Sequence, residues 1–191
     1  MKLAGPGGKD FELKHVDTLI SNINRELEKI EGRSLQGFLA AAAYIFDDMD
    51  RTPPRIPIDT GNLRASFFIV STKGGGDHSK GTGDFTGEDA SEMKNEKNQI
   101  TSMVESALMT FRQPAVGMGF SANYATFVHE NLEANFAGDQ SKIQRTKSGK
   151  ATAATRKFTR RPGAGPRFFS TALERNQSKI LEIVAKYARI Q

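Results

Sequence analysis

The chain has 191 residues, of which 37% are hydrophobic and 26% are charged, and its formal net charge is +5. These values fit one medium-sized domain with a modest core. Because the chain has no cysteine, disulfides, thiol nucleophiles and thiolate metal sites are excluded. The three histidines show no metal-ligand spacing, no apolar run is long enough to span a membrane, and the N-terminus does not resemble a secretory signal.

The first fifty residues predict two helices after a flexible, Gly-rich segment at 1–10. Apolar residues at intervals of three and four predict a helix over about 12–31, which Gly32 is expected to stop. Ser34 can cap a second helix, and Pro53 and Pro54 end it. Three acidic residues lie at its C-terminal end, where the helix dipole disfavours them: Asp47, Asp48 and Asp50. They indicate either a functional acidic patch or a solvated cluster.

The middle of the chain predicts two short strands separated by a polar insertion at 73–99. The β-rich run 67–71 is the first strand, and 115–120 is the second, with Gly117 and Gly119 on one face for close packing. The Gly-rich part, 73–88, is typical of a flexible loop or a hairpin tip, and 88–111 has the spacing of a helix.

The last third predicts a short amphipathic helix or strand–turn at 123–130, then a long basic loop at 131–161, and a C-terminal helix at 166–190. Nine basic residues and no acidic ones lie between Gln140 and Arg167, so the rest of the chain has a net charge of −4. This asymmetry indicates either a polyanionic or acidic partner for the segment, or a loop charged only for solubility.

Enzyme chemistry has few candidates, namely Asp59, His129 and Glu130. The pair His129–Glu130 lacks the spacing of a zinc-protease motif, and neither a nucleophile elbow nor a phosphate-binding loop is present. A histidine beside a glutamate is more typical of a structural hydrogen bond. We therefore expect no catalytic, metal-binding or cofactor-binding residue.

Three segments, taken in order, carry a family resemblance. They are IPIDTGNLRAS at 56–66, VG at 116–117 followed by NYATFVHE at 123–130, and RRPGAGPRFF at 160–169. This ordered set resembles the pattern of the minor tail components of long-tailed bacteriophages, which are the tail-completion or head–tail joining (neck) proteins. The chain departs from that pattern in the length of its 73–99 and 131–161 segments.

The resemblance implies a single α+β domain, with a small, mainly antiparallel sheet packed by N-terminal and C-terminal helices. It also implies a non-enzymatic virion protein of the tail or neck, assembled in the bacterial host cytoplasm. The expected partners are further copies of the chain in a ring, most often a hexamer, together with the tail tube protein and a head–tail adaptor or stopper protein. The ring would surround the genomic DNA, and no membrane contact is expected.

The motif residues divide into structural and interface candidates. Asp59, Thr60 and Gly61 are expected to form a turn after Pro57, capped by Asp59 or Thr60, that directs Leu63 inward and Arg64 outward. Tyr124, Phe127 and Val128 are expected to pack on the sheet. Phe168 and Phe169 are expected to anchor the last helix as core residues, and Pro162 and Gly163 to fix where that helix begins. Arginine pairs well with carboxylates, so the candidates for a subunit or partner interface are the acidic residues and these basic ones: Arg64, Arg156, Lys157, Arg160, Arg161 and Arg167.

Two alternatives stay open from the residues alone. The segment 140–167 could bind nucleic acid, although Phe158 is its only aromatic residue for base stacking. The chain could also form another head–tail adaptor or stopper ring. A hydrolase centred on His129 is the third and weakest hypothesis. For the basic loop, one specific partner is the acidic helix end of a neighbouring subunit, at Asp47, Asp48 and Asp50.

Overall fold

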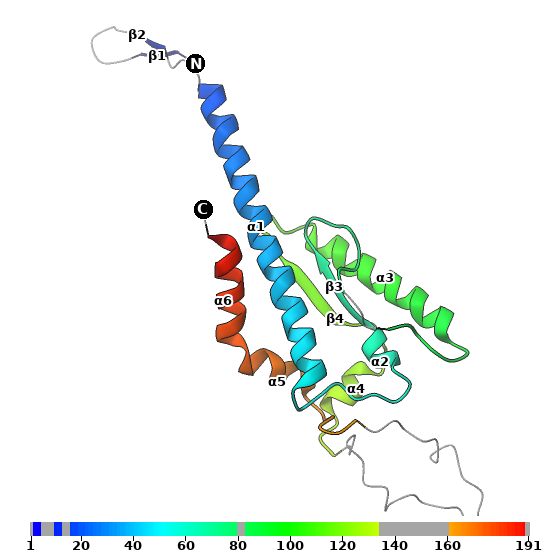
Figure 1. The fold of residues 1–191 in the computed structure, drawn as a ribbon. Helices are drawn as coiled ribbons and strands as arrows, with labels where there is room; N and C mark the ends of the chain where they lie inside the picture. Colours follow the sequence, from blue (N-terminus) through cyan, green and yellow to red (C-terminus); the bar gives the residue numbers. More distant parts are fainter. Residues whose placement is uncertain (1, 5–9, 13–15, 80–82, 134–160, 190–191) are drawn as a thin grey trace, which may run out of the picture.

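The computed structural model describes residues 2–4, 10–12, 16–79, 83–133 and 161–189. Figure 1 shows the order β1 (Lys2–Ala4), β2 (Asp10–Glu12), α1 (Val16–Arg51), α2 (Asn62–Ala65), β3 (Phe67–Ser71), α3 (Ala90–Leu108), β4 (Val116–Phe120), α4 (Ala125–Glu130), α5 (Phe168–Arg175) and α6 (Gln177–Ala188). The fold is α+β, as the sequence predicted. The segment 1–10 contributes β1 and the first residue of β2 to a small hairpin, and its residues 5–9 lie outside the described part.

A three-layer arrangement forms the body of the protein. β3 and β4 pair as an antiparallel sheet in the register Phe67↔Phe120 to Ser71↔Val116. α1 packs on one face of this sheet and α3 on the other, while α5 and α6 pack along α1. All five residues of β3 are buried, because helices cover both of its faces.

The core lies between α1, the sheet and α5. Ile45 and Met49 of α1 meet Phe67 and Ile69 of β3, and the buried Phe168 of α5 completes the cluster. The rings of Phe46, Phe67, Phe120 and Phe168 follow one another at centroid distances of 4.4, 5.2 and 5.5 Å. The predicted core role of Phe168 and Phe169 is confirmed, since Phe169 also packs against this cluster.

The close approach predicted at Gly117 is also confirmed, and its partner is α3. A Cβ atom at Gly117 would lie 2.9 Å from the Cγ1 atom of Val104 and 3.2 Å from the Cδ1 atom of Leu108. The helix within the predicted polar insertion therefore forms a layer of the body, and only its first half falls inside 73–99.

The two predicted N-terminal helices are one helix, so the predicted stop at Gly32 is wrong. The apolar positions 20, 23 and 27 recur at 38, 41 and 45, which is a step of 18 residues or about five turns of 3.6 residues. The apolar stripe therefore keeps its phase across Gly32. A glycine inside a helix costs about 1 kcal/mol, which the packing of the following turns offsets.

The predicted C-terminal helix is divided at Asn176 into α5 and α6. The Asn176 side chain is buried and donates to the Ala172 carbonyl at 2.8 Å and to the Asp48 carboxylate at 2.9 Å. This side chain competes with the helical hydrogen-bond pattern, which explains the interruption. It also ties the break to the C-terminal end of α1.

The outer edge of β3 is covered by residues 77–79. The Asp77 carboxylate accepts from the Ile69 N–H at 2.9 Å, the His78 N–H donates to the Ile69 carbonyl at 2.6 Å, and Lys97 of α3 pairs with Asp77 at 2.8 Å. The loop predicted at 73–88 thus closes a strand edge that would otherwise be open to another chain.

Asp77 makes this edge pH-sensitive. Burial alone would raise the pKa of its carboxyl, but Lys97 and the N–H groups of Ile69 and Ser79 outweigh burial and lower the pKa. A lowered folded-state pKa adds stability above the unfolded value of about 3.9, and this stability is lost as pH falls through the folded-state pKa. We expect Asp77→Asn to lower the free energy of unfolding by about 1–2 kcal/mol at neutral pH.

The difference in free energy of unfolding between the Asp77→Asn variant and the parent should shrink as pH falls below about 3.9. Urea titrations followed by circular dichroism measure this difference. Asp84→Asn, at an exposed position of the same connection between β3 and α3, is the matched control and should show almost no difference. A gap for Asp77→Asn that stays constant from neutral to strongly acid pH would contradict the pairing.

Candidate functional site

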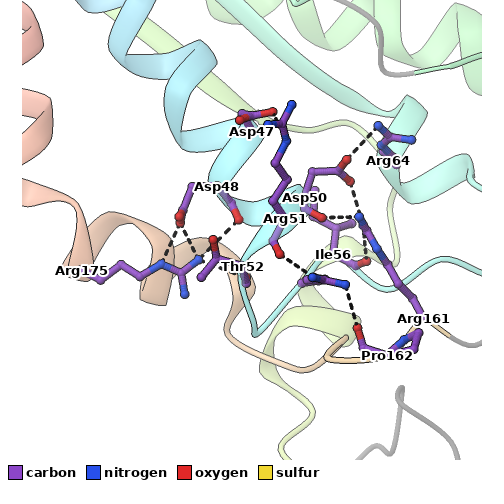
Figure 2. Close-up of polar contacts among 11 residues, drawn as sticks. Asp47, Asp48, Asp50, Arg51, Thr52, Ile56, Arg64, Arg161, Pro162 and Arg175 are labelled. Carbon is purple, nitrogen blue, oxygen red and sulfur yellow. Dashed lines mark hydrogen bonds and ion pairs between the residues drawn. The ribbon is translucent and has the colours of Figure 1, made fainter.

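The candidate site is the C-terminal end of α1, where Asp48 and Asp50 meet arginines from distant parts of the chain. Figure 2 shows Arg64, Arg161 and Arg175 around this end. Arg175 of α5 donates from Nε and Nη2 to the Asp48 carboxylate at 2.7 and 2.5 Å. The same Oδ2 atom of Asp48 also accepts from Asn176 at 2.9 Å, so this oxygen has three donors from the C-terminal part of the chain.

Asp50 lies between two arginines, and we call Asp50, Arg64 and Arg161 the Asp50 cluster. Its Oδ2 atom accepts from Arg64 at 2.9 Å and its Oδ1 atom from Arg161 at 2.7 Å. Arg161 donates in addition to the backbone carbonyls of Asp50 and Ile56. The Asp50 side chain is only 16% exposed, so the cluster is a largely buried network.

The same arginines also neutralise the partial negative charge at this helix end. The last carbonyls of a helix lack intrahelical partners and carry a partial negative charge. Arg161 donates to the carbonyl of Asp50 and Arg175 to that of Thr52 (Figure 2), and Arg175 donates in addition to the Pro53 carbonyl. The cations therefore compensate both the acidic side chains and the dipole, which explains how this acidic end is stable.

Four of the nine residues predicted for an interface, Asp48, Asp50, Arg64 and Arg161, pair inside one chain. These pairs give them a structural role that the sequence did not predict. Asp47 differs, because its side chain is 50% exposed and its partner among the described residues is Arg51, one turn away at 2.9 Å. Arg167 is exposed and lies 4.0 Å from Glu174. Its role in an interface stays a prediction.

The first motif segment forms the turn that supplies Arg64. Gly61 has φ of +92°, a conformation that side chains disfavour, and it precedes the single helical turn α2. Asp59 makes no capping hydrogen bond, contrary to prediction, whereas the Thr60 hydroxyl accepts weakly from the Asn62 N–H at 3.4 Å. Leu63 is buried as predicted, and Arg64 turns to Asp50 instead of solvent.

Asn62 has a role that the sequence did not indicate. Its buried side chain donates to the Thr86 carbonyl at 2.9 Å and accepts from the Thr86 N–H at 2.8 Å. This reciprocal pair fastens the loop before α3 to the first motif. An asparagine after a glycine reads as an ordinary turn residue, so no local signal distinguishes this role.

The second motif segment is α4 with the turn before it. Tyr124 and Val128 pack against the core as predicted, but Phe127 is 68% exposed, so its predicted packing is wrong. Burial, and then the nearby Asp59 carboxylate, raise the pKa of the Tyr124 phenol. The first and second motifs are therefore neighbours in the fold.

His129 links the second motif to the third. Its Nδ1 atom lies 2.5 Å from a Glu130 carboxylate oxygen, and its Nε2 atom accepts from the Ser170 N–H at 3.3 Å. Its backbone carbonyl accepts from the Arg167 N–H at 2.7 Å. The Nδ1 contact stays within α4 and is the His–Glu pairing that the sequence favoured, whereas the Nε2 atom and the backbone carbonyl hold α4 to the start of α5.

The third motif segment contacts the first where Arg161 donates to the Ile56 carbonyl at 3.4 Å, and backbone hydrogen bonds join it to Arg55, the residue just before the first segment. Arg55 donates to the Gly163 carbonyl at 2.7 Å and accepts from the Gly165 N–H at 3.2 Å, beside an isolated parallel bridge between Arg55 and Ala164. Gly163 has φ of +76° and lies against Pro53. The three segments that carry the family resemblance thus converge around one end of α1.

Several predicted residues lie outside the described part of the chain. They are Arg156, Lys157 and Arg160, together with most of the basic loop. Among the described residues, no group of three or more His, Cys, Asp and Glu side chains is arranged to hold a metal ion. No helix in the described residues has the length and apolar character needed to cross a membrane.

Comparison of the chain with protein-family models, with curated proteins and with solved structures finds no match. The resemblance to phage neck proteins therefore stays a prediction from the three motif segments.

Proposed function

We propose that the protein is a structural component of the phage neck, a tail-completion or terminator-type ring that joins the tail tube to the head-side connector. The observation that carries the proposal is the ordered three-part motif, whose segments contact one another in the fold. The third segment contacts the first through Arg161, which donates to the Ile56 carbonyl, and the second through Arg167, whose N–H donates to the His129 carbonyl. Motif residues that are far apart in the sequence but bonded to one another in the fold form one structural unit, which explains why they occur together.

The chemistry of the site also favours a structural role. The charged groups at the end of α1 neutralise one another, and His129 is fixed by two partners. Free acids, bases or nucleophiles that converge on a cavity are the usual sign of catalysis. The cluster described here instead fixes the relative positions of α1, α2 and α5, as a ring subunit under load requires. We infer a non-enzymatic protein.

Exposed backbone offers one route to subunit contact. β3 is covered by residues 77–79 on its outer side, whereas in the described residues β4 has no strand partner other than β3. An open edge on a short strand can pair with another chain. The proposal favours the terminator ring, with an adaptor or stopper ring as the alternative within the neck.

The competing nucleic-acid proposal uses the basic segment 140–167. Of its nine basic residues, Arg161 is committed to Asp50, and seven lie outside the described residues. Neutralising Arg156, Lys157 and Arg160 while keeping Arg161 separates the two functions without disturbing the Asp50 cluster. Loss of salt-sensitive DNA affinity with intact assembly would favour nucleic-acid binding as a separate property.

The proposed function is tested by mixing the purified protein with the tail tube protein and with the connector proteins encoded beside it. We expect a complex of higher mass with at least one of them in light scattering coupled to gel filtration. The triple variant of Arg156, Lys157 and Arg160 serves as the matched comparison for the basic loop. No complex with any of these proteins, together with absence from purified particles, would overturn the proposal.

A further inference from the structure

The N-terminal half of α1 extends beyond the body of the protein and carries a bare apolar stripe. Ile20 and Ile23 are 50% exposed and Leu27 is 51% exposed. In Figure 1 this half of the helix extends beyond the sheet and beyond α6, and the β1–β2 hairpin lies near its N-terminal end. The packed part begins near Gly37, where the absence of a side chain lets the Val184 backbone approach. We call residues 20–30 of α1 the arm.

A second apolar surface lies on the body. A groove of about 350 Å³ opens between α1, β4 and the C-terminal helices, and it is lined almost only by apolar side chains. Its walls include Phe38, Ala42, Val116, Met118, Leu173 and Ile180. Val116 belongs to the strand whose outer edge lacks a strand partner in the described residues.

We propose that the arm of one copy of this chain occupies the apolar groove of a neighbouring copy. The sizes agree, since a cavity of about 150 Å³ holds one benzene molecule and the groove, at about 350 Å³, has room for two aliphatic side chains. Ile23 and Leu27 lie one turn apart on one face of the helix and so can enter one groove together, and Ile20 extends the same face. Burying apolar side chains of this type supplies the usual driving force for association.

The arm that occupies the groove must belong to another molecule, because one continuous helix carries both the arm and one wall of the groove. Ile20 and Phe38 are separated by five turns of α1, or about 27 Å along its axis. The arm cannot fold back onto the groove of its own chain without breaking that helix. An arm-to-groove contact is heterologous, and it leaves a free arm and a free groove at the ends of any open chain of subunits.

Such a contact generates a ring when the rotation between subunits closes. The inference rests on the proposed ring function for its biological setting, but it concerns only surfaces of this chain. The stripe is flanked by charges of both signs, including Arg25, Glu26, Glu28 and Lys29. The contact should therefore depend little on salt, unlike one made by opposite charges.

The cysteine-free sequence allows a direct test by disulfide trapping. Ile23→Cys, on the arm, and Ala115→Cys, in the groove wall, are made in separate full-length chains, one of which carries an affinity tag. The two proteins are mixed at high concentration under mild oxidation. Phe127→Cys, at an exposed position on α4 outside both surfaces, replaces Ala115→Cys in the control mixture.

We expect the tagged and untagged chains to be linked several-fold more in the arm–groove mixture than in the control, equally at low and high salt. Adding Leu27→Lys should abolish this excess, whereas Asn22→Lys, with the same charge change at a polar position outside the apolar stripe, should preserve it. Dimers of Ile23→Cys alone would show that arms pair with arms. That result, or equal yields in both mixtures, overturns the inference but leaves the tail-protein test of the function unaffected.

Discussion

Asp50→Ala is expected to lower the free energy of unfolding by about 3 kcal/mol, the low end of the range for breaking a buried ion pair. The substitution removes the one carboxylate that accepts from both Arg64 and Arg161. Two partly buried guanidinium groups then lose their counter-ion, and their desolvation is no longer compensated. Urea denaturation, with the midpoint and slope both fitted, measures the loss.

The matched control for this variant is Asp47→Ala, three residues earlier on the same helix. The Asp47 side chain is 50% exposed against 16% for Asp50, and its single pair with Arg51 lies within one helical turn. Exposed pairs of this type contribute about 0.3–0.5 kcal/mol. If the two variants lose equal stability, the Asp50 cluster is not the network described here.

Gly163→Ala is expected to cost about 3 kcal/mol, from two separate causes. The φ of +76° at Gly163 costs an alanine about 1–2 kcal/mol. A Cβ atom there would also lie 2.8 Å from the Cγ atom of Pro53, and overpacking of a rigid neighbour costs about 1–3 kcal/mol. The contact would push the third motif segment away from Arg55.

Gly61→Ala separates these two causes, because it has the first without the second. Gly61 has φ of +92°, and a Cβ atom built there has no neighbour within 4 Å. We expect it to lose only the conformational part, about 1–2 kcal/mol. Thermal unfolding of both variants under identical conditions gives the comparison. A Gly163→Ala variant no less stable than Gly61→Ala would show that the third motif does not press on Pro53.

Periodicity in the sequence predicted the body of the fold well. The run 67–71 is β3, the glycines at 117 and 119 mark a strand that α3 approaches closely, and Phe168 is a core residue. These features depend on local spacing and side-chain size. The predicted break at Gly32 is wrong because the apolar stripe keeps its phase through this residue, and that periodicity outweighs the glycine as a stop signal.

The pairing of the charged residues could not be predicted in the same way. Asp50 and Arg161 are 111 residues apart, and Asp48 and Arg175 are 127 apart, so no local pattern connects them. The same arginines look equally suited to a neighbouring subunit when the sequence is considered alone. Only the fold, which brings α2 and α5 to the end of α1, shows that one chain satisfies these charges by itself.

The basic segment 140–167 is therefore not a single partner-binding surface, because part of it is structural. Its last members, Arg161 and Arg167, lie in the third motif, where Arg161 is a structural residue and Arg167 is exposed. The other seven basic residues lie outside the described part of the chain. This is why a variant neutralised at Arg156, Lys157 and Arg160 is a cleaner probe of partner binding than one that also lacks Arg161.

The central claim, a neck ring, is tested most directly by electron cryo-microscopy of intact particles produced from the genome that encodes this chain. The account predicts a closed ring at the junction of tail and head into which the α1–sheet–α3 body fits, with each arm directed toward the adjacent subunit. Complete, infectious particles that contain no copy of this chain would contradict it.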